Sequence, residues 1–228
     1  MIVDVEATTA IRQAEVGAAR TMLDRTAEQF HLAPSRLVAD ASYGSAEMLG
    51  WLVDERAIEP HVKVFDKSER TDGTFSRGDF AYDMEADLYT CPGGKELMTY
   101  RRAFAAPRDG VMKDGTICYR ASKLDCEACA LKPQCCSNAV SRKIARSIYE
   151  AARDKARAIA KTAAYAISRR ERKKVEMLFA HLKRILRLDR LRLRGPNGAK
   201  DEFLLAATAQ NLRKLAKLVP LPAPAFAA

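Results

Sequence analysis

Residues 172–183 restrict the fold most, because this stretch can form little except a helix. It contains neither Gly nor Pro and consists mainly of strong helix formers. Arg172, Glu176 and Lys183 fall on one stripe of that helix. The neighbouring stripe is apolar and predicted to be buried, and consists of Val175, Phe179, Leu182 and Leu186. By itself the pattern is typical of a salt-bridged helix surface, and only the rest of the chain can favour a functional carboxylate flanked by cations.

Charge is distributed unevenly along the 228 residues, whose net charge is +10. Residues 1–140 contain 17 Lys and Arg against 22 Asp and Glu, whereas residues 141–218 contain 22 against 7. Such an excess of cations on predicted helices indicates a polyanionic partner, with nucleic acid as the first candidate. A generally basic, well-solvated surface is the alternative interpretation.

The composition also bears on where the protein works. No run of 18 apolar residues occurs, so we expect no membrane span. The first residues lack the basic start and the apolar block of a signal peptide. The sequence therefore predicts a cytoplasmic protein, in which six cysteines indicate metal ligands or free thiols before disulfides.

The first segment, residues 1–66, alternates predicted strands and helices, which indicates an α/β fold with parallel strands. The predicted order is a strand at 2–8, a helix at 11–31, a short apolar run that ends at Asp40, a helix at 46–56 and a strand at 59–65. Ligands of such sheets gather at the carboxyl ends of the strands, which is where Asp40 stands. The helix at 11–31 is expected to bury Ile11, Val16, Met22, Leu23 and Phe30.

Residues 67–142 are rich in turns and contain short β-like pieces, so we interpret them as a small β-rich insertion. Three of its cysteines have the spacing C-x2-C-x5-C, to which Cys91 or Cys118 could add a fourth thiolate around a structural Zn²⁺. The alternative is that the cysteines are free. The insertion contains Cys91, Cys118, Cys126, Cys129, Cys135 and Cys136, and of these we expect Cys91, Cys126, Cys129 and Cys135 as the zinc ligands.

Residues 143–218 form the third segment and are predicted to be helical. One helix is expected from about 144 to 188 with a break near 166–168, and the turn at 195–198 separates it from a last helix. Asp201 can cap that last helix, predicted at 202–218. Its expected buried residues are Phe203, Leu204, Leu212 and Leu215, and the Pro- and Ala-rich residues 219–228 are predicted to be a disordered tail.

Two carboxylates are candidates for catalysis: Asp40 at a predicted strand end and Glu176 on the long helix. Together they could hold Mg²⁺ (or Mn²⁺), which activates a water or a 3′-hydroxyl in phosphodiester chemistry. For Asp40 the alternative is a turn-capping role. Cations around Glu176 would hold a DNA backbone, and the predicted DNA-binding residues are Arg169, Arg172, Lys173, Lys174, Lys183 and Arg187.

Several stretches resemble the DDE transposases of bacterial insertion sequences. LVADASYGS is similar to the family's second-aspartate segment, with Asp40 as the metal ligand. RKKVEMLFAHLK is similar to the glutamate-helix signature R-x3-E-x6-K, met here by Arg172, Glu176 and Lys183. The family usually has Tyr where this chain has Arg169. YRASKLDCEACALKPQCC is similar to the cysteine-bearing insertion of one subgroup, and RLRLRG and DEFLLAATAQNLRKL resemble the segments after the glutamate, so the likeness covers nearly the whole chain.

The resemblance implies a ribonuclease H-like core, incomplete at its N-terminal side, with the β-rich insertion and C-terminal helices. It implies metal-dependent cleavage of transposon-end DNA and strand transfer of the 3′-hydroxyl into a target. Double-stranded DNA would be the substrate, and the chain would associate with itself or with full-length transposase. Arg172 and Lys183 would contact DNA phosphates near the scissile site.

One catalytic residue of that family has no counterpart here. Its first aspartate lies on an earlier strand, and Asp4 does not replace it, because the strand of Asp4 resembles the third of the sheet. We therefore expect a truncated transposase that is inactive alone and needs a carboxylate from another chain. The alternatives are a non-catalytic remnant that binds DNA or inhibits the full-length enzyme, and a zinc-stabilised interaction module.

Overall fold

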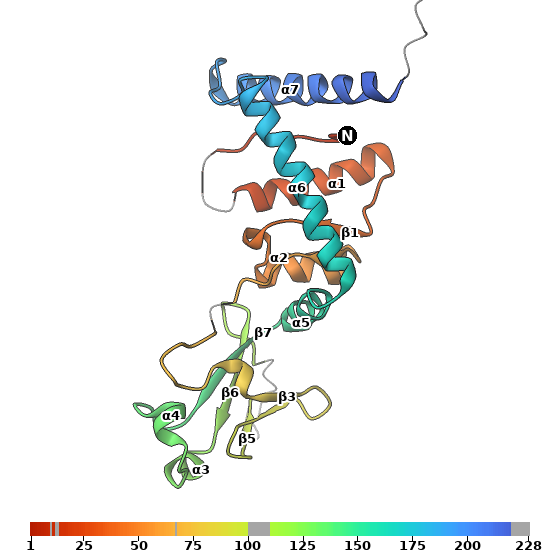
Figure 1. The fold of residues 1–228 in the computed structure, drawn as a ribbon. Coiled ribbons are helices and arrows are strands. Elements are labelled where there is room, and N and C mark those ends of the chain that lie inside the picture. Colours follow the sequence, from red (N-terminus) through yellow and green to blue (C-terminus); the bar gives the residue numbers. More distant parts are fainter. Residues whose placement is uncertain (10, 12–13, 67, 100–109, 220–228) are drawn as a thin grey trace, which may run out of the picture. The chain divides into compact units, whose positions relative to one another are not determined.

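The computed structural model describes residues 1–9, 11, 14–66, 68–99 and 110–219. The described chain is a mixed α/β protein, which agrees with the expected fold class, and it divides into two compact units (Figure 1). Unit 1 comprises Met1–Gly44, Arg56–Lys63 and Ala156–Ala228, and unit 2 comprises Ser45–Glu55 and Val64–Lys155. Among the described residues, no helix is long and apolar enough to cross a membrane.

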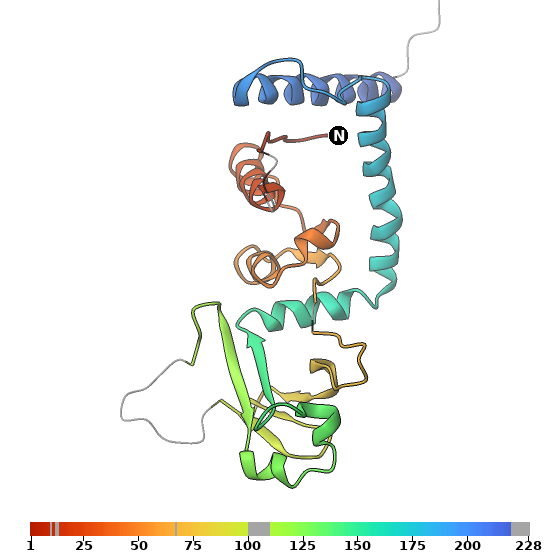
Figure 2. The ribbon, with the colours of Figure 1, turned by 90° about the vertical axis from the view of Figure 1, so that its left-hand side faces the viewer.

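Unit 1 contains a parallel pair of short strands and the longest helices of the described chain. Strands β1 and β2 pair in parallel, with Leu37 opposite Pro60, as the sequence predicts. Helix α6 packs on β1 and on α7, which runs across its C-terminal end (Figures 1 and 2). The elements are α1 Ala14–Phe30, β1 Arg36–Val38, the 3₁₀ turn η1 Ala41–Tyr43, β2 Glu59–His61, α6 Ala163–Arg184 and α7 Gly195–Leu218.

The strand predicted at residues 2–8 is wrong, since this described segment is irregular. Its polar groups are bound by side chains instead of by a neighbouring strand. Asn211 of α7 accepts from the backbone N–H of Ile2 and donates to its carbonyl, each at 2.7 Å. Arg25 of α1 binds the Asp4 carboxylate at 2.8 Å. Because both partners lie on helices of unit 1, the segment is fixed on these helices without joining a sheet.

The helix predicted at residues 11–31 exists, but it begins at Ala14 and buries a different set of side chains. The small residues Ala18 and Ala19 are its buried positions. Ile11 and Phe30, which we expected inside, are more than half exposed. The other expected core residues of this helix, Val16, Met22 and Leu23, are half-buried.

Unit 2 is built on a five-stranded antiparallel sheet in the order β3-β4-β5-β6-β7. This sheet confirms the β-rich character predicted for the region. Short helices and helical turns surround it, and α3 and α4 lie near each other beyond one end of the sheet (Figures 1 and 2). The strands are β3 Ala81–Asp83, β4 Leu88–Thr90, β5 Glu96–Met98, β6 Thr116–Ala121 and β7 Lys143–Ser147. The helical elements are α2 Ala46–Gly50, the π-helical turn η2 Trp51–Glu55, the 3₁₀ turn η3 Arg77–Asp79, α3 Lys123–Glu127 and α4 Lys132–Cys136.

A compact aromatic and aliphatic core lies on one face of this sheet. Tyr89 and Tyr119 pack edge-to-face with ring centroids 5.2 Å apart, a geometry that favours the ring quadrupoles. The Arg146 guanidinium lies 3.7 Å from the Tyr82 ring centroid and donates to the Tyr89 hydroxyl at 3.1 Å. The buried cluster consists of Phe80, Tyr89, Leu97, Tyr119, Ala121, Cys126 and Ile144.

Two boundaries of the predicted long helix are wrong. Residues 143–147 form strand β7 instead of the start of a helix, with Ile144 and Arg146 buried and their neighbours more exposed. The cation–π contacts of Arg146 allow this charged residue to occupy a buried strand position. The sequence therefore lacks the alternation of apolar and polar residues that would predict a strand here. The helical part divides into α5 Glu150–Ile159 and α6, so the break lies at residues 160–162 instead of 166–168. Thr162 caps α6 by accepting from the N–H of Tyr165 at 3.2 Å.

The last helix begins at Gly195, seven positions before the predicted start at 202. The turn predicted at 195–198 is therefore wrong, and so is the Asp201 cap, because Arg194 occupies the N-cap position. Pro196 lies in the first turn, where its fixed φ and missing N–H suit a helix start. The buried residues are Ala207 and Gln210, whereas three of the four expected ones are exposed: Leu204, Leu212 and Leu215. Phe203 is half-buried, and the predicted tail from 220 onward lies outside the described residues.

A buried charge network joins the segments of unit 2. The Glu150 carboxylate, only 2% exposed, accepts from Arg77 at 2.9 and 3.1 Å and from Arg153 at 2.8 Å. Arg77 also binds Asp66 at 2.9 Å, and Arg153 donates to the carbonyl of Phe65 at 3.1 Å. The two guanidinium groups satisfy a carboxylate that would otherwise be costly to bury.

We predict that Glu150→Ala lowers the free energy of unfolding by about 3–5 kcal/mol, because two buried guanidinium groups lose their carboxylate. Urea denaturation followed by circular dichroism measures this change. Glu171→Ala is the matched control, since Glu171 makes an exposed ion pair with Lys174 at 3.7 Å. Its loss should change stability by less than about 0.5 kcal/mol. Equal urea midpoints for the two variants would contradict the prediction.

Candidate metal and nucleic-acid site

Asp40 stands directly after β1, at the carboxyl end of the parallel pair. It caps the 3₁₀ turn η1, with its Oδ1 accepting from the N–H of Ser42 at 2.8 Å and from the Ser42 hydroxyl at 2.5 Å. The turn-capping role that we considered as the alternative therefore exists in the structure. It does not exclude metal binding, because the residue is exposed and one of its two carboxylate oxygens makes these bonds.

A second carboxylate, which sequence reasoning missed, lies beside Asp40. Glu15, in the first turn of α1, has its Oε1 3.2 Å from the same Ser42 hydroxyl. The pKa of Tyr43 is raised first by burial and then by the negative charges of Glu15 and Asp40, which both face it. Acidic residues are common in the first turn of a helix, so nothing in the sequence distinguishes Glu15.

Arg172 connects the helix of Glu176 to the strand end of Asp40. Its Nε lies 3.3 Å from Oε1 of Glu176, one turn further along α6. Another guanidinium nitrogen donates to the carbonyl of Ala39, the residue before Asp40, also at 3.3 Å. The two predicted catalytic carboxylates therefore lie in the same unit, on two elements that one guanidinium joins.

A basic cavity of about 330 Å³ opens beside Glu176 on the N-terminal half of α6. It is lined by Ala166, Arg169, Arg170, Arg172, Lys173 and Glu176. Three of these cations were predicted to bind DNA, namely Arg169, Arg172 and Lys173. Guanidinium groups and an ammonium around a polar hollow suit the oxygens of phosphates.

The other predicted DNA-binding residues do not line this cavity. Lys174 pairs with Glu171 at 3.7 Å. Lys183 lies on the same face of α6 as Arg172 and Glu176, about 10 Å along the axis from Glu176, and lines a different, mainly apolar cavity. Arg187 follows the end of α6 with a φ of 53° and is exposed. Basic groups thus extend along the helix, but only its first half gathers them around Glu176.

The apolar stripe predicted on α6 is not buried as expected. Val175 and Phe179 are 48% and 59% exposed, Leu186 is 37% exposed, and Leu182 is half-buried. Three members of the stripe line an apolar cavity of about 640 Å³, together with Phe203 of α7. These three are Val175, Phe179 and Leu182. The stripe therefore faces a hollow that the N-terminal segment, α1 and α7 also line.

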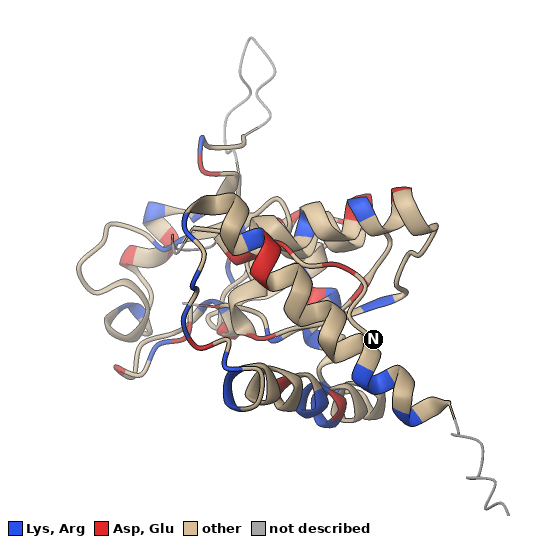
Figure 3. Cartoon of the chain, turned by 90° about the horizontal axis from the view of Figure 1, so that it is seen from above, with Lys and Arg blue, Asp and Glu red and all other residues tan. Residues whose placement is uncertain are grey.

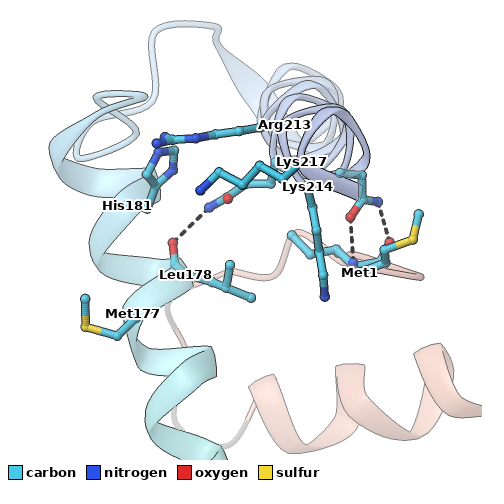
Figure 4. A pocket seen from close by; sticks show the side chains of 10 residues that line it. Met1, Met177, Leu178, His181, Arg213, Lys214 and Lys217 are labelled. Atoms are coloured by element: carbon cyan, nitrogen blue, oxygen red, sulfur yellow. Dashed lines mark hydrogen bonds between the residues drawn. The ribbon is translucent and has the colours of Figure 1, made fainter. Parts of the chain in front are cut away.

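A further cavity of about 230 Å³ lies between the C-terminal halves of α6 and α7 (Figure 4). The Arg213 side chain extends toward His181, and Lys217 lies nearby. Burial lowers the pKa of His181, and the charges of Arg213 and Lys217 lower it further.

Lys and Arg also gather in the last turns of α7 (Figure 3). The sequence reasoning assigned no role to these cations, although their spacing along the predicted last helix could have revealed them.

Five of the six cysteines surround one small cavity in unit 2, whereas Cys118 does not line it. Burial raises the pKa of the Cys135 thiol to about 11, and that of Cys126 is also raised, chiefly by burial. The cavity is lined by Cys91, Cys126, Cys129, Cys135 and Cys136, together with Lys95, Ala121, Asp125, Lys132 and Arg142. Among the described residues, no three His, Cys, Asp or Glu side chains stand together in a metal-binding arrangement, neither here nor around Asp40.

A comparison with protein families gives a match that covers much of the chain. A family model described as a transposase DDE domain matches residues 90–216, which is more than half of the chain. The matched region includes Glu176, Arg172, Lys183 and all six cysteines, while Asp40 precedes it. No curated protein and no solved structure gives a significant match.

Proposed function

The chain belongs to the transposase DDE-domain family, and on that premise we propose that it acts in DNA transposition through Asp40 and Glu176. The reaction proposed is metal-dependent cleavage of transposon-end DNA followed by transfer of the 3′-hydroxyl into a target. The observation that carries the proposal is the Arg172 bridge, which joins the helix of Glu176 to the residue before Asp40. Family membership alone would not connect these two positions, because Asp40 lies outside the matched region.

A ribonuclease H-like core around this site is part of the proposal. Its support is local: β1 and β2 are parallel, Asp40 stands at their carboxyl end, and α6 packs on β1. In open α/β sheets this edge is where ligands bind. The antiparallel sheet of unit 2 would then be the insertion. It extends past the expected boundary at residue 142, because β7 Lys143–Ser147 belongs to the sheet.

The side chains near Asp40 and Glu176 suit a hard divalent cation. Carboxylate oxygens are the ligands that Mg²⁺ and Mn²⁺ prefer, and Asp40 and Glu176 would hold such an ion. When bound, the ion would activate the attacking hydroxyl or water and stabilise the leaving oxygen. Arg172 would hold Glu176 toward Asp40, and Ser42 would orient the Asp40 carboxylate through its backbone N–H and hydroxyl.

The cations of α6 would hold the DNA backbone beside this pair of carboxylates. Arg169, Arg170 and Lys173 surround the cavity that Glu176 also lines. Contacts of this kind are made to phosphates, so they position double-stranded DNA without reading its sequence. Lys183, further along the same face, would extend the contact.

We propose that the chain associates with another transposase chain, of the same kind or full-length. The second candidate function is a DNA-binding or inhibitory protein without catalysis of its own. The basic cavity favours it, because phosphate contacts there need no third carboxylate.

We expect that the chain mixed with full-length transposase of the same element nicks transposon-end DNA in the presence of Mg²⁺ or Mn²⁺. Asp40→Ala combined with Glu176→Ala should abolish the share of nicking that this chain contributes, because the metal ligands are gone. The matched control is Glu171→Ala, which removes an exposed carboxylate of the same helix. Unchanged nicking by the double variant would refute the catalytic assignment and favour the inhibitory candidate.

DNA affinity should depend on the cations of the basic cavity. Arg169→Ala combined with Lys173→Ala should weaken binding to duplex DNA and reduce the slope of log affinity against log salt by about 2. Fluorescence anisotropy at several salt concentrations measures both quantities. Lys123→Ala combined with Lys143→Ala is the control of equal charge, since both lysines are exposed and lie in unit 2. Equal losses in the two double variants would show that only net charge matters.

A further inference from the structure

Three separate segments of unit 2 bring their thiols to one place. Cys91 follows strand β4, Cys126 and Cys129 lie in and just after α3, and Cys135 ends α4 together with Cys136. All five line a single cavity of about 20 Å³, and none forms a disulfide. Cysteine is often buried simply as a small apolar residue. Burial as small apolar residues does not explain why five thiols surround so small a cavity. These thiols come from segments up to 45 positions apart in the sequence.

The turn that carries Cys91 is shaped around its sulfur. The N–H of Lys95 donates to the Cys91 Sγ at 3.3 Å, while the backbone of Cys91 pairs with Lys95 and Gly94 at 2.9 and 2.8 Å. A backbone N–H aimed at sulfur stabilises a thiolate and orients a metal ligand. A Cβ at Gly93 would lie 3.5 Å from the Cys129 Sγ and 3.7 Å from the Cys91 Sγ. The turn therefore runs close to sulfurs of two segments.

Positive groups stand beside these thiols. Lys95, Lys132 and Arg142 line the same cavity. Arg142 is only 8% exposed and donates to the carbonyls of Cys135 and Phe75 at 2.8 and 3.0 Å. Its Nε has no hydrogen-bond partner among the residues that the structure describes. A buried donor without a partner is costly, and a thiolate in the cavity would satisfy it. Four thiolates on Zn²⁺ carry a net charge of −2, which these cations would offset.

α3 and α4 carry three of these cysteines, and all three belong to or pack against the apolar cluster of the sheet. α3 and α4 have five residues each, which is far too short for a helix to be stable alone. Leu124 of α3 is 75% exposed, and the buried residue of that helix is Cys126 itself. A structural metal would add a direct link between these two helices and the turn that carries Cys91.

We propose that Cys91, Cys126, Cys129 and Cys135 bind one structural Zn²⁺, which ties α3 and α4 to the end of β4. Binding would displace one proton from each thiol. Rotation of the four side chains would bring each sulfur to about 2.3 Å from the zinc ion, in a tetrahedral arrangement. Because adjacent residues of a helix point about 100° apart, only one of Cys135 and Cys136 reaches the ion. We assign Cys135, which completes the C-x2-C-x5-C spacing, and leave Cys136 as the spare thiol. The fourth ligand is thus Cys91, and Cys118, the other candidate from the sequence, is excluded by its position outside the cavity.

The first test uses the wild-type chain purified without chelator. Elemental analysis should find one zinc per chain, and exchange for Co²⁺ should give sulfur-to-cobalt charge-transfer absorption with the intense visible bands of a tetrahedral site. Substoichiometric zinc without cobalt–thiolate absorption would overturn the proposal and leave the cysteines as packing thiols. A disulfide among these cysteines, found by mass spectrometry of the freshly purified protein, would also overturn it.

Variants then assign the ligands. Cys91→Ser, Cys129→Ser and Cys135→Ser should each lose the bound zinc, whereas Cys118→Ser and Cys136→Ser should keep it. Asp40→Ala combined with Glu176→Ala should also keep it, so this result is independent of the transposase proposal. Because a ligand variant can fail to fold, the Co²⁺ spectrum of each soluble variant is compared with that of Cys118→Ser. Zinc retained by Cys91→Ser, or lost by Cys118→Ser, would overturn the assignment.

Discussion

The arrangement of the candidate site depends on one guanidinium group. Arg172 contacts the Glu176 carboxylate within α6 and the Ala39 carbonyl at the end of β1, both at 3.3 Å. An ion pair between side chains that are 40% and 60% exposed contributes no more than about 1 kcal/mol to stability. Its significance is therefore positional: it links the helix of Glu176 to the strand end that carries Asp40. The same residue also lines the basic cavity, so it belongs both to the proposed carboxylate pair and to the surface that we propose binds phosphates.

Unit 2 is stabilised by different means. Its sheet buries a small aromatic core, and a fully enclosed carboxylate with two arginines joins residues 66, 77, 150 and 153. The cysteine cavity lies where two five-residue helices meet the turn after β4. Buried ion pairs and a structural metal are both ways in which a small β module offsets a limited core.

Much of the candidate site could be predicted from the sequence, because residues close together in the sequence form its parts. The spacing of Arg172, Glu176 and Lys183 defines one helix face, and a short apolar run followed by small residues marks the strand end at Asp40. The contact of Arg172 with the Ala39 carbonyl could not be predicted, since it joins positions 133 residues apart. Glu15 was missed for the same reason, because it is linked to Asp40 only through the Ser42 hydroxyl.

The errors in the fold have specific physical causes. Strand β7 carries Arg146 at a buried position, where tyrosine rings accept its charge, so the residue pattern does not look like a strand. Gly195 and Pro196 suggest a turn, but a proline in the first turn of a helix is favourable, and α7 begins there. The N-terminal residues alternate like a strand, yet Asn211 binds the backbone of Ile2 and leaves the segment unpaired.

The central claim is that Arg172 brings Asp40 and Glu176 together as one metal site. A crystal structure of the chain with Mn²⁺, examined by anomalous diffraction, tests it most directly. The account predicts manganese density bound by both carboxylates, with Arg172 still in contact with the Ala39 carbonyl. Density at only one of the two carboxylates, or manganese bound elsewhere while the two lie apart, would contradict it.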